Sequence, residues 1–520
     1  MKVLVTGGTG VVGHAAVTAL LARGHSVRLL SRHAARDARQ WAARVEAFPG
    51  DVGRPATLRG AAEGCDAVLH VVGIVAESPP EITLERVNVD GTRHLLAETQ
   101  RAKVGKFIFV SSLGAERGTS EYHQSKRRAE ALVRKFEGGW VILRPGNVYG
   151  PGDGEISLLL KMIRSLPVVP VVGDGDQEFQ PIWHQDLGQA LALAVERHDL
   201  HGRVLEIAGA EATSQNDLLE RLRTLTSRDP VRVPLPGFLT ELGAKLAASM
   251  HIELPFNEDQ LAMLREQNVI EDPADNALTA VFRIEATPLD EGLRMLVDEQ
   301  PEVLPAQGVG ALKRKRFWAH IHDSPHTPES LFALVRREFP RVFPLPTSAE
   351  PGTPRTPDYG ETLTMALPVR GHIQVRVADV EDRQLTLITL EGHPLAGAVR
   401  MLSEQRGDAL RFEVQVYDRS SNSVDYLLMS TLGNLMQNAN WEEVVENAVE
   451  LSGGRAPDDV EHEIEALDDQ QAERIDEWLE ELVLRLRRSE TESRGAERDE
   501  AHGQSRDRSP DRGDSTELRP

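Results

Sequence analysis

The chain has 520 residues, more than a single hydrophobic core usually serves, so two or three domains are expected. Its 81 acidic residues against 59 basic ones leave a net charge of -22, which excludes nucleic acid and anionic membrane surfaces as main partners. The single cysteine, Cys65, excludes an internal disulfide and suits a reducing compartment. The sequence shows no signal-peptide pattern and no apolar run of about 18 residues. Together these features predict a cytoplasmic protein without a membrane-spanning segment.

Short apolar runs alternate with amphipathic segments through the first 150 residues. Strands are predicted at residues 2–6, 25–30, 45–48, 66–72, 106–111 and 140–144. Helices are predicted between them, at residues 11–23, 56–63, 83–103 and 122–136. Strands that alternate with helices indicate βαβ crossovers, and near-continuous apolar strands indicate a sheet covered on both faces. The sequence therefore predicts an α/β fold with a doubly wound parallel sheet.

The pattern loosens over residues 151–300, where helices predominate and short strands are predicted in "VVPVVG" and "RVLEIAG". This composition predicts a small substrate lobe that completes one domain over residues 1–300. Residues 301–316 carry Pro, Gly and basic side chains, and they are predicted to be a linker.

A second unit is predicted at residues 317–453. A helix that starts near Thr327 precedes strands of alternating polarity in "HIQVRVADV", "QLTLITLEG" and "ALRFEVQVYDR". The pattern indicates a separate α+β domain of unknown role, which offers a surface for a protein partner or a second copy of the chain. Residues 454–487 are predicted to form an acidic helix, and residues 488–520, with almost no apolar content, a disordered tail.

A glycine-rich turn follows the first strand in "VTGGTGVVG". Gly7, Gly10 and Gly13 let a dinucleotide pyrophosphate approach the backbone, because no Cβ intrudes. The helix that begins near Val11 directs its free N–H groups and positive dipole end toward the phosphates. We therefore predict a dinucleotide site formed by these glycines together with Thr6, Val11 and Val12.

The end of the second strand distinguishes the two nicotinamide dinucleotides. NAD enzymes place an acidic residue there, whereas NADP enzymes place a basic one. Here the strand is followed by Ser31 and Arg32, and a guanidinium can hold a 2′-phosphate through two hydrogen bonds. We therefore prefer NADP(H), with NAD(H) and a solvated Arg32 left open. Asp51 and Val52 follow the third strand, where the carboxylate either accepts from the adenine amino group or caps a helix.

Several motifs together resemble the short-chain dehydrogenase/reductase superfamily, in its extended or atypical, NAD-dependent epimerase/dehydratase-like branch. They are "TGGTGVVG", "GDV", "NVDGT", "YHQSK" and "LRPGNVYGPGD". The segment "VSSLGA" is most similar to the branch that includes the NADPH-binding accessory subunit of respiratory complex I. The resemblance covers about the first 300 residues and implies a Rossmann-type fold. It also implies that Gly73 passes the cofactor ribose and that Pro145 and Gly146 lie beside the nicotinamide.

A serine, a tyrosine and a lysine follow the fifth strand in "VSSLGAERGTSEYHQSK". A phenol has an ordinary pKa of about 10, and an ammonium four residues later on the same helix face lowers it. Tyr122 is therefore the candidate general acid or base and Lys126 the residue that tunes it. The resemblance implies that Lys126 also holds the nicotinamide ribose and that Ser112 hydrogen-bonds the substrate oxygen, with Ser111 as the second choice.

Two functions fit this pattern. The first is an NAD(P)-dependent oxidoreductase or epimerase/dehydratase that transfers hydride at a carbon bearing a hydroxyl or carbonyl group, with a small-molecule substrate. The alternative is a non-catalytic NADP(H)-binding sensor or scaffold, which the short interval of ten residues between Ser112 and Tyr122 favours. Asn88, His184 and Asp186 are interpreted as structural. The histidines near His320 are interpreted as surface residues, and no metal site is predicted.

Overall fold

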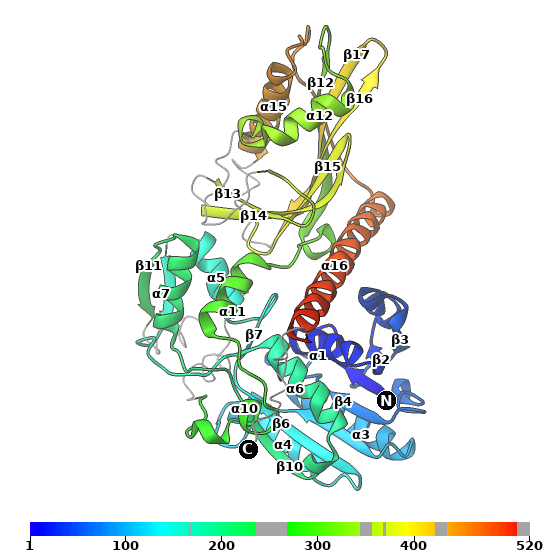
Figure 1. Cartoon of the computed structure of the whole chain (residues 1–520), viewed down its shortest axis with the longest axis vertical. Helices are drawn as coiled ribbons and strands as arrows, with labels where there is room; N and C mark the ends of the chain where they lie inside the picture. Colours follow the sequence, from blue (N-terminus) through cyan, green and yellow to red (C-terminus); the bar gives the residue numbers. More distant parts are fainter. Residues whose placement is uncertain (166–167, 236–267, 344–355, 368–370, 422–433, 507–520) are drawn as a thin grey trace, which may run out of the picture.

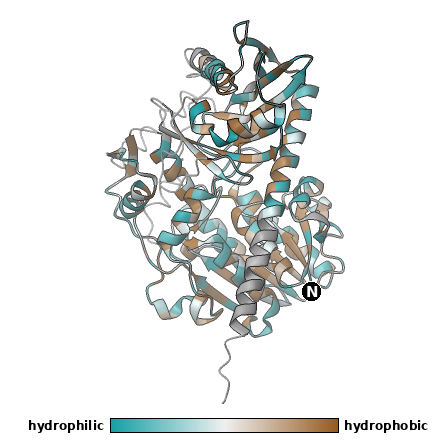
Figure 2. Ribbon diagram, turned by 45° about the horizontal axis from the view of Figure 1, so that its top comes forward, coloured by the Kyte–Doolittle hydropathy of each residue, from teal (hydrophilic) through white to brown (hydrophobic). Residues whose placement is uncertain are grey.

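The computed structural model of the chain describes residues 1–165, 168–235, 268–343, 356–367, 371–421 and 434–506 (Figure 1). In these residues two large sheets lie at opposite ends of the molecule, and the small lobe and helix α16 lie between them. Hydrophobic residues follow the strands of both sheets (Figure 2).

The N-terminal sheet is parallel throughout, with the strand order β10-β6-β5-β4-β1-β2-β3. Its strands are β1 Lys2–Thr6, β2 Ser26–Ser31, β3 Val45–Pro49, β4 Ala67–His70, β5 Lys106–Val110, β6 Gly139–Pro145 and β10 Arg203–Ile207. The predicted doubly wound fold is confirmed. The strand in "RVLEIAG", which we placed in the substrate lobe, belongs instead to this sheet, because β10 pairs with β6 along its whole length.

Helices cover both faces of this sheet. On one face, α1 (Val11–Ala22) and α6 (His184–Glu196) pack over inward-facing residues such as Val5 and Ile108. On the other face, α3 (Gly91–Arg101) and α4 (Glu121–Val133) pack over residues that include Leu4, Phe107 and Phe109. This burial of both faces explains why the strands are near-continuous apolar runs.

One predicted helix is wrong, and another is modified. At residues 56–63 the chain forms only a short 3₁₀ turn, η2 (Pro55–Leu58), because Gly60 takes a φ of +88° that ends any helical path. At residues 83–103 the helix begins as a π-helical turn, η3 (Glu85–Asp90), before α3 starts.

The small lobe packs around its own apolar core. It contains the helices α5 (Ile156–Ser165), α7 (Gln215–Thr226) and α11 (Leu289–Asp298), and the paired strands β8 (Val168–Val172) and β11 (Val231–Leu235). A second short pair, β7 (Val148–Tyr149) with β9 (Ile182–Trp183), joins this lobe to the end of β6. In the sequence, α5 therefore follows shortly after β6, which ends at the carboxyl edge of the parallel sheet.

The C-terminal sheet is antiparallel, with the order β13-β14-β15-β16-β17-β12-β18. Its strands are β12 Val309–Ile321, β13 Thr362–Leu367, β14 Gly371–Glu381, β15 Gln384–Thr389, β16 Leu395–Arg406, β17 Ala409–Ser420 and β18 Glu461–Ala466. One face is covered by α12 (Pro328–Arg337), α13 (Phe339–Val342) and α15 (Asn434–Leu451).

Three sequence boundaries in this half are corrected. The predicted linker is wrong from Val309 onward, because its basic side chains pair across β12 with acidic partners: Lys315 with Asp418 at 2.8 Å and Arg316 with Glu413 at 2.7 Å. Part of the predicted acidic helix forms the edge strand β18. The helix that follows, α16 (Asp469–Arg506), runs on into the segment predicted to be disordered, and residues 507–520 lie outside the described residues.

Helix α16 connects the two ends of the molecule. Its apolar residues, which include Leu479 and Leu482, pack on the face of the antiparallel sheet opposite α15. Further along, Arg487 donates to Gln40 at 3.3 Å, in η1 (Ala38–Arg44) of the parallel domain (Figure 1). Within the described ranges, no helix combines the length and the apolar content that a membrane crossing requires.

Candidate active site

The glycine-rich turn lies at the carboxyl end of β1 and leads into α1. At Gly7, which has a φ of +70°, a Cβ would lie 2.8 Å from the backbone nitrogen of Val72, and at Gly13 it would lie 2.0 Å from the Gly7 carbonyl. Protein packing therefore requires glycine at both positions. At Gly10 the nearest atom to an added Cβ is 3.7 Å away. Packing does not explain this glycine, and its open side suits the close approach of a pyrophosphate.

The N-terminus of α1 faces this open side. Gly10 is the N-cap, no side chain caps the helix, and Val11 and Val12 form its first turn. Their backbone N–H groups have no partner within the helix and are available to phosphate oxygens. Thr6 is fully buried, and its hydroxyl bonds to His70 Nδ1 at 2.7 Å inside the sheet, so its predicted contact with the cofactor stays a prediction for its backbone.

The residues predicted near the adenosine lie after β2 and β3. Ser31 donates a hydrogen bond to the buried carboxylate of Asp37, while the guanidinium of Arg32 is exposed and, among the described residues, engaged by no hydrogen bond or ion pair. Asp51 accepts from the Gly53 N–H at 2.8 Å within the turn, whereas the N-cap of the next 3₁₀ turn, η2, is Arg54 without a side-chain cap, so the helix-capping alternative is wrong and the adenine contact stays a prediction. Val52 is buried, and its carbonyl bonds to His94 at 2.8 Å.

Ser112, Tyr122 and Lys126 meet where β5 ends and α4 begins. The Ser112 and Tyr122 hydroxyls are hydrogen-bonded to each other. Lys126 is buried, donates to the Val110 carbonyl at 3.0 Å, and places its Nζ 5.9 Å from the centre of the Tyr122 ring. Ser111, the second choice, points elsewhere and donates to Glu130 at 2.6 Å. The structure thus brings together the three residues predicted to be catalytic.

The electrostatics of this group differ from the prediction. Burial raises the pKa of Tyr122 to about 12; the hydrogen bond from Ser112 opposes this rise, and the charge of Glu155 adds to it. Burial also lowers the pKa of Lys126 to about 8, against the charge of Glu130. The predicted lowering of the phenol pKa by Lys126 is therefore wrong for this state, because desolvation acts on both groups and the ammonium is directed at a backbone carbonyl.

The short interval between Ser112 and Tyr122 is a closed turn. The ring of His123 lies between Gly114 and Gly118, where an added Cβ would come within 2.5 Å and 2.3 Å of it. Arg127 donates to the Ala115 carbonyl through Nε and to the Gly118 carbonyl through Nη2, both at 2.9 Å. Two side chains of α4, His123 and Arg127, therefore hold the turn closed, and the closed turn brings Tyr122 to Ser112.

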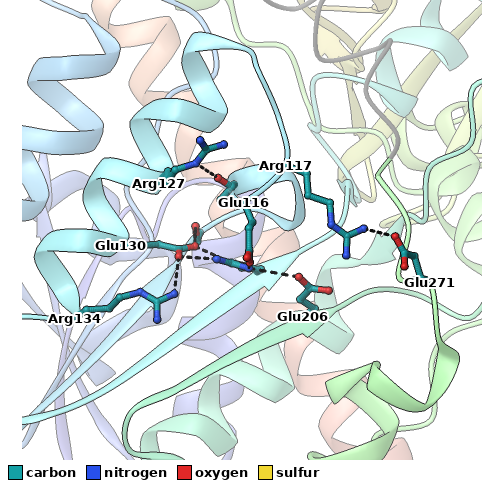
Figure 3. A network of polar contacts seen from close by, with 10 residues as sticks. Glu116, Arg117, Arg127, Glu130, Arg134, Glu206 and Glu271 are labelled. Atoms are coloured by element: carbon teal, nitrogen blue, oxygen red, sulfur yellow. Dashed lines mark hydrogen bonds and ion pairs between the residues drawn. The ribbon is translucent and has the colours of Figure 1, made fainter.

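A buried ion-pair network supports the same turn (Figure 3). Arg144 on β6 forms two bonds to Glu130 on α4, each at 2.9 Å, and also pairs with Glu116 of the turn. Burial works to raise the pKa of Glu130, but the bonds from Arg144 and Ser111 outweigh it and lower that pKa. The network ties the ends of β5 and β6 to α4, next to the turn that bears Ser112.

Asn88 joins the loop after β4 to α4. It accepts from the Ile74 N–H at 2.9 Å and donates to Ser125 Oγ at 2.9 Å, one residue before Lys126. The structural interpretation of Asn88 is confirmed. At Gly73 an added Cβ would lie 2.7 Å from Lys126 Nζ, so the lysine reaches its place only because this residue is glycine.

The end of β6 adds an acidic residue that the sequence did not indicate. Pro145 closes β6, and at Gly146 a Cβ would lie 2.3 Å from the Gln180 carbonyl. Asn147 then donates to Glu155 at 2.6 Å, and Glu155 is the carboxylate that acts on the Tyr122 phenol. The only signal in the sequence was the position of Asn147 directly after Pro145 and Gly146.

Asp186 is structural, as interpreted: it accepts from the Thr287 N–H at 2.8 Å and from the Thr287 hydroxyl at 3.1 Å, which fastens α6 to the lobe. In the part of the chain that the structure describes, no group of three or more His, Cys, Asp or Glu side chains is placed to hold a metal ion.

Comparison with known proteins agrees with this geometry. The model of the NAD dependent epimerase/dehydratase family matches residues 3–208. The ceramide reductase of Caulobacter vibrioides is 33% identical over 242 residues, covering 46% of this chain and 75% of that protein. Sterol demethylase protein B of Methylococcus capsulatus is 30% identical over 269 residues, covering 46% and 79%.

Among solved structures, MoeE5 in complex with UDP-glucose and NAD is similar, with 23% identity and a TM-score of 0.44 over 57% of this chain and 97% of that chain. The family match ends at residue 208 and does not include the C-terminal domain. The predicted resemblance is confirmed: the chain is an NAD(P)-dependent enzyme that belongs to the NAD dependent epimerase/dehydratase family.

Proposed function

We propose that the protein is an NAD(P)-dependent oxidoreductase that reduces a carbonyl group, or oxidises the corresponding alcohol, with Tyr122 as the proton-transferring residue. The observation that carries this proposal is the hydrogen bond between Ser112 and Tyr122, with buried Lys126 beside the ring. These side chains lie at the carboxyl edge of the parallel sheet, where ligands of such sheets bind.

The residues around the turn after β1 fit a dinucleotide. Gly10 leaves the backbone open, Val11 and Val12 present free N–H groups, and Lys126 lies against Gly73, where its ammonium can hold ribose hydroxyls. When bound, the cofactor supplies or accepts the hydride. The protein supplies orientation and proton transfer.

Ser112 donates its O–H to the Tyr122 oxygen, and this leaves the phenol O–H for a substrate oxygen. Because the pKa of Tyr122 is about 12, the phenol is protonated at neutral pH, so it is ready to give a proton to an oxygen that gains negative charge. This favours the reducing direction. Two relatives, a ceramide reductase and a ketoreductase of Stigmatella aurantiaca, support the same direction.

We also propose NADP(H) as the preferred dinucleotide. Arg32 is exposed and free within the described residues, and further arginines follow it closely in a chain that is otherwise strongly acidic; they are Arg36, Arg39 and Arg44. Asp37, the acidic residue of this stretch, is already bonded to Ser31. A doubly charged 2′-phosphate is attracted to such a surface, whereas the 2′-hydroxyl of NAD gains little from it.

The test compares the full-length protein with Tyr122→Phe and, as a matched control, Tyr359→Phe, which alters an exposed tyrosine of the C-terminal half. NADPH oxidation is followed with a panel of ketones and aldehydes, and the affinities for NADPH and NADH are measured by fluorescence. We expect Tyr122→Phe to lower kcat by about 10²- to 10⁴-fold with little change in NADPH affinity, because only the proton donor is lost. The control should behave as wild type.

Tight NADPH binding without turnover by any protein of the set would contradict the catalytic proposal. It would favour the alternative, a non-catalytic NADP(H)-binding sensor or scaffold. Tighter binding of NADH than of NADPH would overturn the cofactor preference and leave the proton-transfer proposal intact.

A further inference from the structure

Glu155 is a carboxylate in the candidate site for which the proposed chemistry has no use. It precedes α5, and its backbone is fixed by Asp153, which accepts from the N–H groups of Glu155 at 2.8 Å and Ile156 at 2.7 Å. Its own carboxylate accepts from Asn147 at 2.6 Å, directly after the Pro145–Gly146 end of β6. Glu155 is therefore held in place at both its backbone and its side chain.

Two asparagine side chains form a series of hydrogen bonds in which each donates to the next and the last donates to Glu155. Asn268 donates to the Asn147 side-chain oxygen, and Asn147 in turn donates to Glu155. At the far end of this series of hydrogen bonds, the side-chain oxygen of Asn268 is buried and has no hydrogen-bond partner among the residues that the structure describes. The site thus presents two acceptors, a carboxylate and an unpaired amide oxygen, and both are best satisfied by a ligand that brings O–H or N–H donors.

The position of Glu155 makes its charge relevant to the reacting group. Its partner Asn147 follows the end of β6, which lies next to β5 in the sheet, and Tyr122 is bonded to Ser112 just beyond the end of β5, so Glu155 belongs to the same edge of the sheet as the reacting group. Burial raises the pKa of Glu155, the hydrogen bond from Asn147 opposes this rise, and the charge of Glu155 in turn raises the pKa of Tyr122. A carboxylate or phosphate near the reacting carbon would meet this charge at close range, where like charges disfavour binding strongly. A hydroxyl or amide at the same place would gain a charge-assisted hydrogen bond.

We propose that Glu155 determines substrate specificity: the site accepts neutral carbonyl compounds or alcohols that carry a hydroxyl or amide group next to the reacting carbon, and it rejects anionic ones. This inference deepens the proposed function and rests on it. Glu155 selects the substrate, and Asn147 and Asn268 are positioning residues that act through it.

The test uses three small ketones of similar size with NADPH and the full-length protein. Hydroxyacetone is neutral and carries a donor, 2-butanone is neutral without one, and pyruvate is anionic. Wild type should favour hydroxyacetone over pyruvate in kcat/KM by about 100-fold and over 2-butanone by about tenfold, as one charge repulsion and one hydrogen bond imply. Glu155→Gln keeps the shape and removes the charge, and it should reduce the preference over pyruvate at least tenfold, mainly through a lower KM for pyruvate.

Glu285→Gln is the matched control, since Glu285 is an exposed acid of the same lobe and, in the described structure, has no partner. It should leave the ratios unchanged. An equal ratio in wild type and Glu155→Gln, or a wild-type preference for pyruvate, would overturn the inference while the proposed function stands. If no ketone is reduced, the proposed function fails.

A second readout is independent of turnover. The phenol of Tyr122 is titrated by ultraviolet difference spectroscopy, with Tyr122→Phe subtracted to isolate it from the other tyrosines. In Glu155→Gln the pKa of Tyr122 should fall, because a negative charge that opposes the phenolate is gone. A titration identical to that of wild type would overturn the placement of Glu155 against Tyr122, whatever the activity.

Discussion

In the described residues the two sheets have the same number of strands but differ in how they use polar residues. The parallel sheet is apolar on both faces, and the residues of its candidate site sit where strands end. The antiparallel sheet carries polar and charged residues within its strands and pairs them across strands, as Arg314 with Glu465 and Arg316 with Glu463. In the parallel sheet, the polar residues at the strand ends are therefore available for catalysis. In the antiparallel sheet, the charged residues instead hold neighbouring strands together.

Each of the two domains contains a buried ion pair, and a hydrogen bond joins them. In the parallel domain, one deeply buried ion pair, Arg144 with Glu130, lies next to the candidate site. In the antiparallel domain, Lys315 and Asp418 form a similarly buried pair inside the sheet. Between the domains, Arg164 on α5 donates to Gln374 on β14 at 2.8 Å. The C-terminal domain is thus fastened to α5, the helix that directly follows Glu155.

The largest expected effect comes from breaking one buried ion pair in each domain. Arg144→Met and Lys315→Met each leave a carboxylate buried without its main partner, at a cost of about 3–5 kcal/mol in the free energy of unfolding. Calorimetry of the full chain should show the parallel domain weakened by the first change and the antiparallel domain by the second. Only Arg144→Met should also lower NADPH oxidation, because its network supports the turn that bears Ser112.

The control for this comparison removes both partners. Lys315→Met combined with Asp418→Leu should recover most of the lost stability, since replacing a whole buried pair by apolar residues is often neutral. A double variant that is as unstable as the single one would show that packing, and not the unpaired charge, causes the loss.

The interface between the domains should give an intermediate effect. Arg164 is almost fully buried and donates to Gln374 and to the Val297 carbonyl, so Arg164→Met should cost about 1.5–3 kcal/mol, the usual range for hydrogen bonds of a charged group. We expect the unfolding transitions of the two domains to separate in calorimetry. Arg294→Met, which alters an exposed arginine of the neighbouring helix α11, serves as the control. Transitions that stay merged in Arg164→Met would show that other contacts couple the domains.

Sequence reasoning succeeded where local pattern decides the structure. In the parallel domain, glycine spacing and continuous apolar runs identified β1 at its observed bounds, and they placed Ser112, Tyr122 and Lys126 near one another. In the antiparallel domain, β12 was missed because its basic run resembles a linker until the acidic partners on β17 and β18 are known. Glu155 was missed for the same reason, since its role depends on Asn147 and Tyr122, which only the fold brings near it.

The most gradual expected effect, spread over several pH units, concerns acid. In the parallel domain, burial and the charge of Lys126 lower the pKa of His70 to about 3. In the same domain, burial and the charge of Arg487 lower the pKa of His14 to about 4. In the antiparallel domain, burial holds the pKa of His393 at about 4. Because these values lie below the ordinary 6.5, the unfolded chain binds protons more readily, and the stability that each histidine contributes above pH 6.5 is lost as the pH falls toward its folded pKa.

Each fully buried histidine can contribute a slope of up to about 1.4 kcal/mol per pH unit. His70 is fully buried, whereas His14 and His393 are partly exposed and contribute less. The parallel domain should therefore lose stability more steeply than the antiparallel domain between pH 6.5 and 4, as followed by Tm in calorimetry. His70→Gln, which keeps a polar side chain between Thr6 and Thr92, should make the two slopes more nearly equal. Slopes that are equal already in wild type would mean that the difference in histidine burial does not control acid stability.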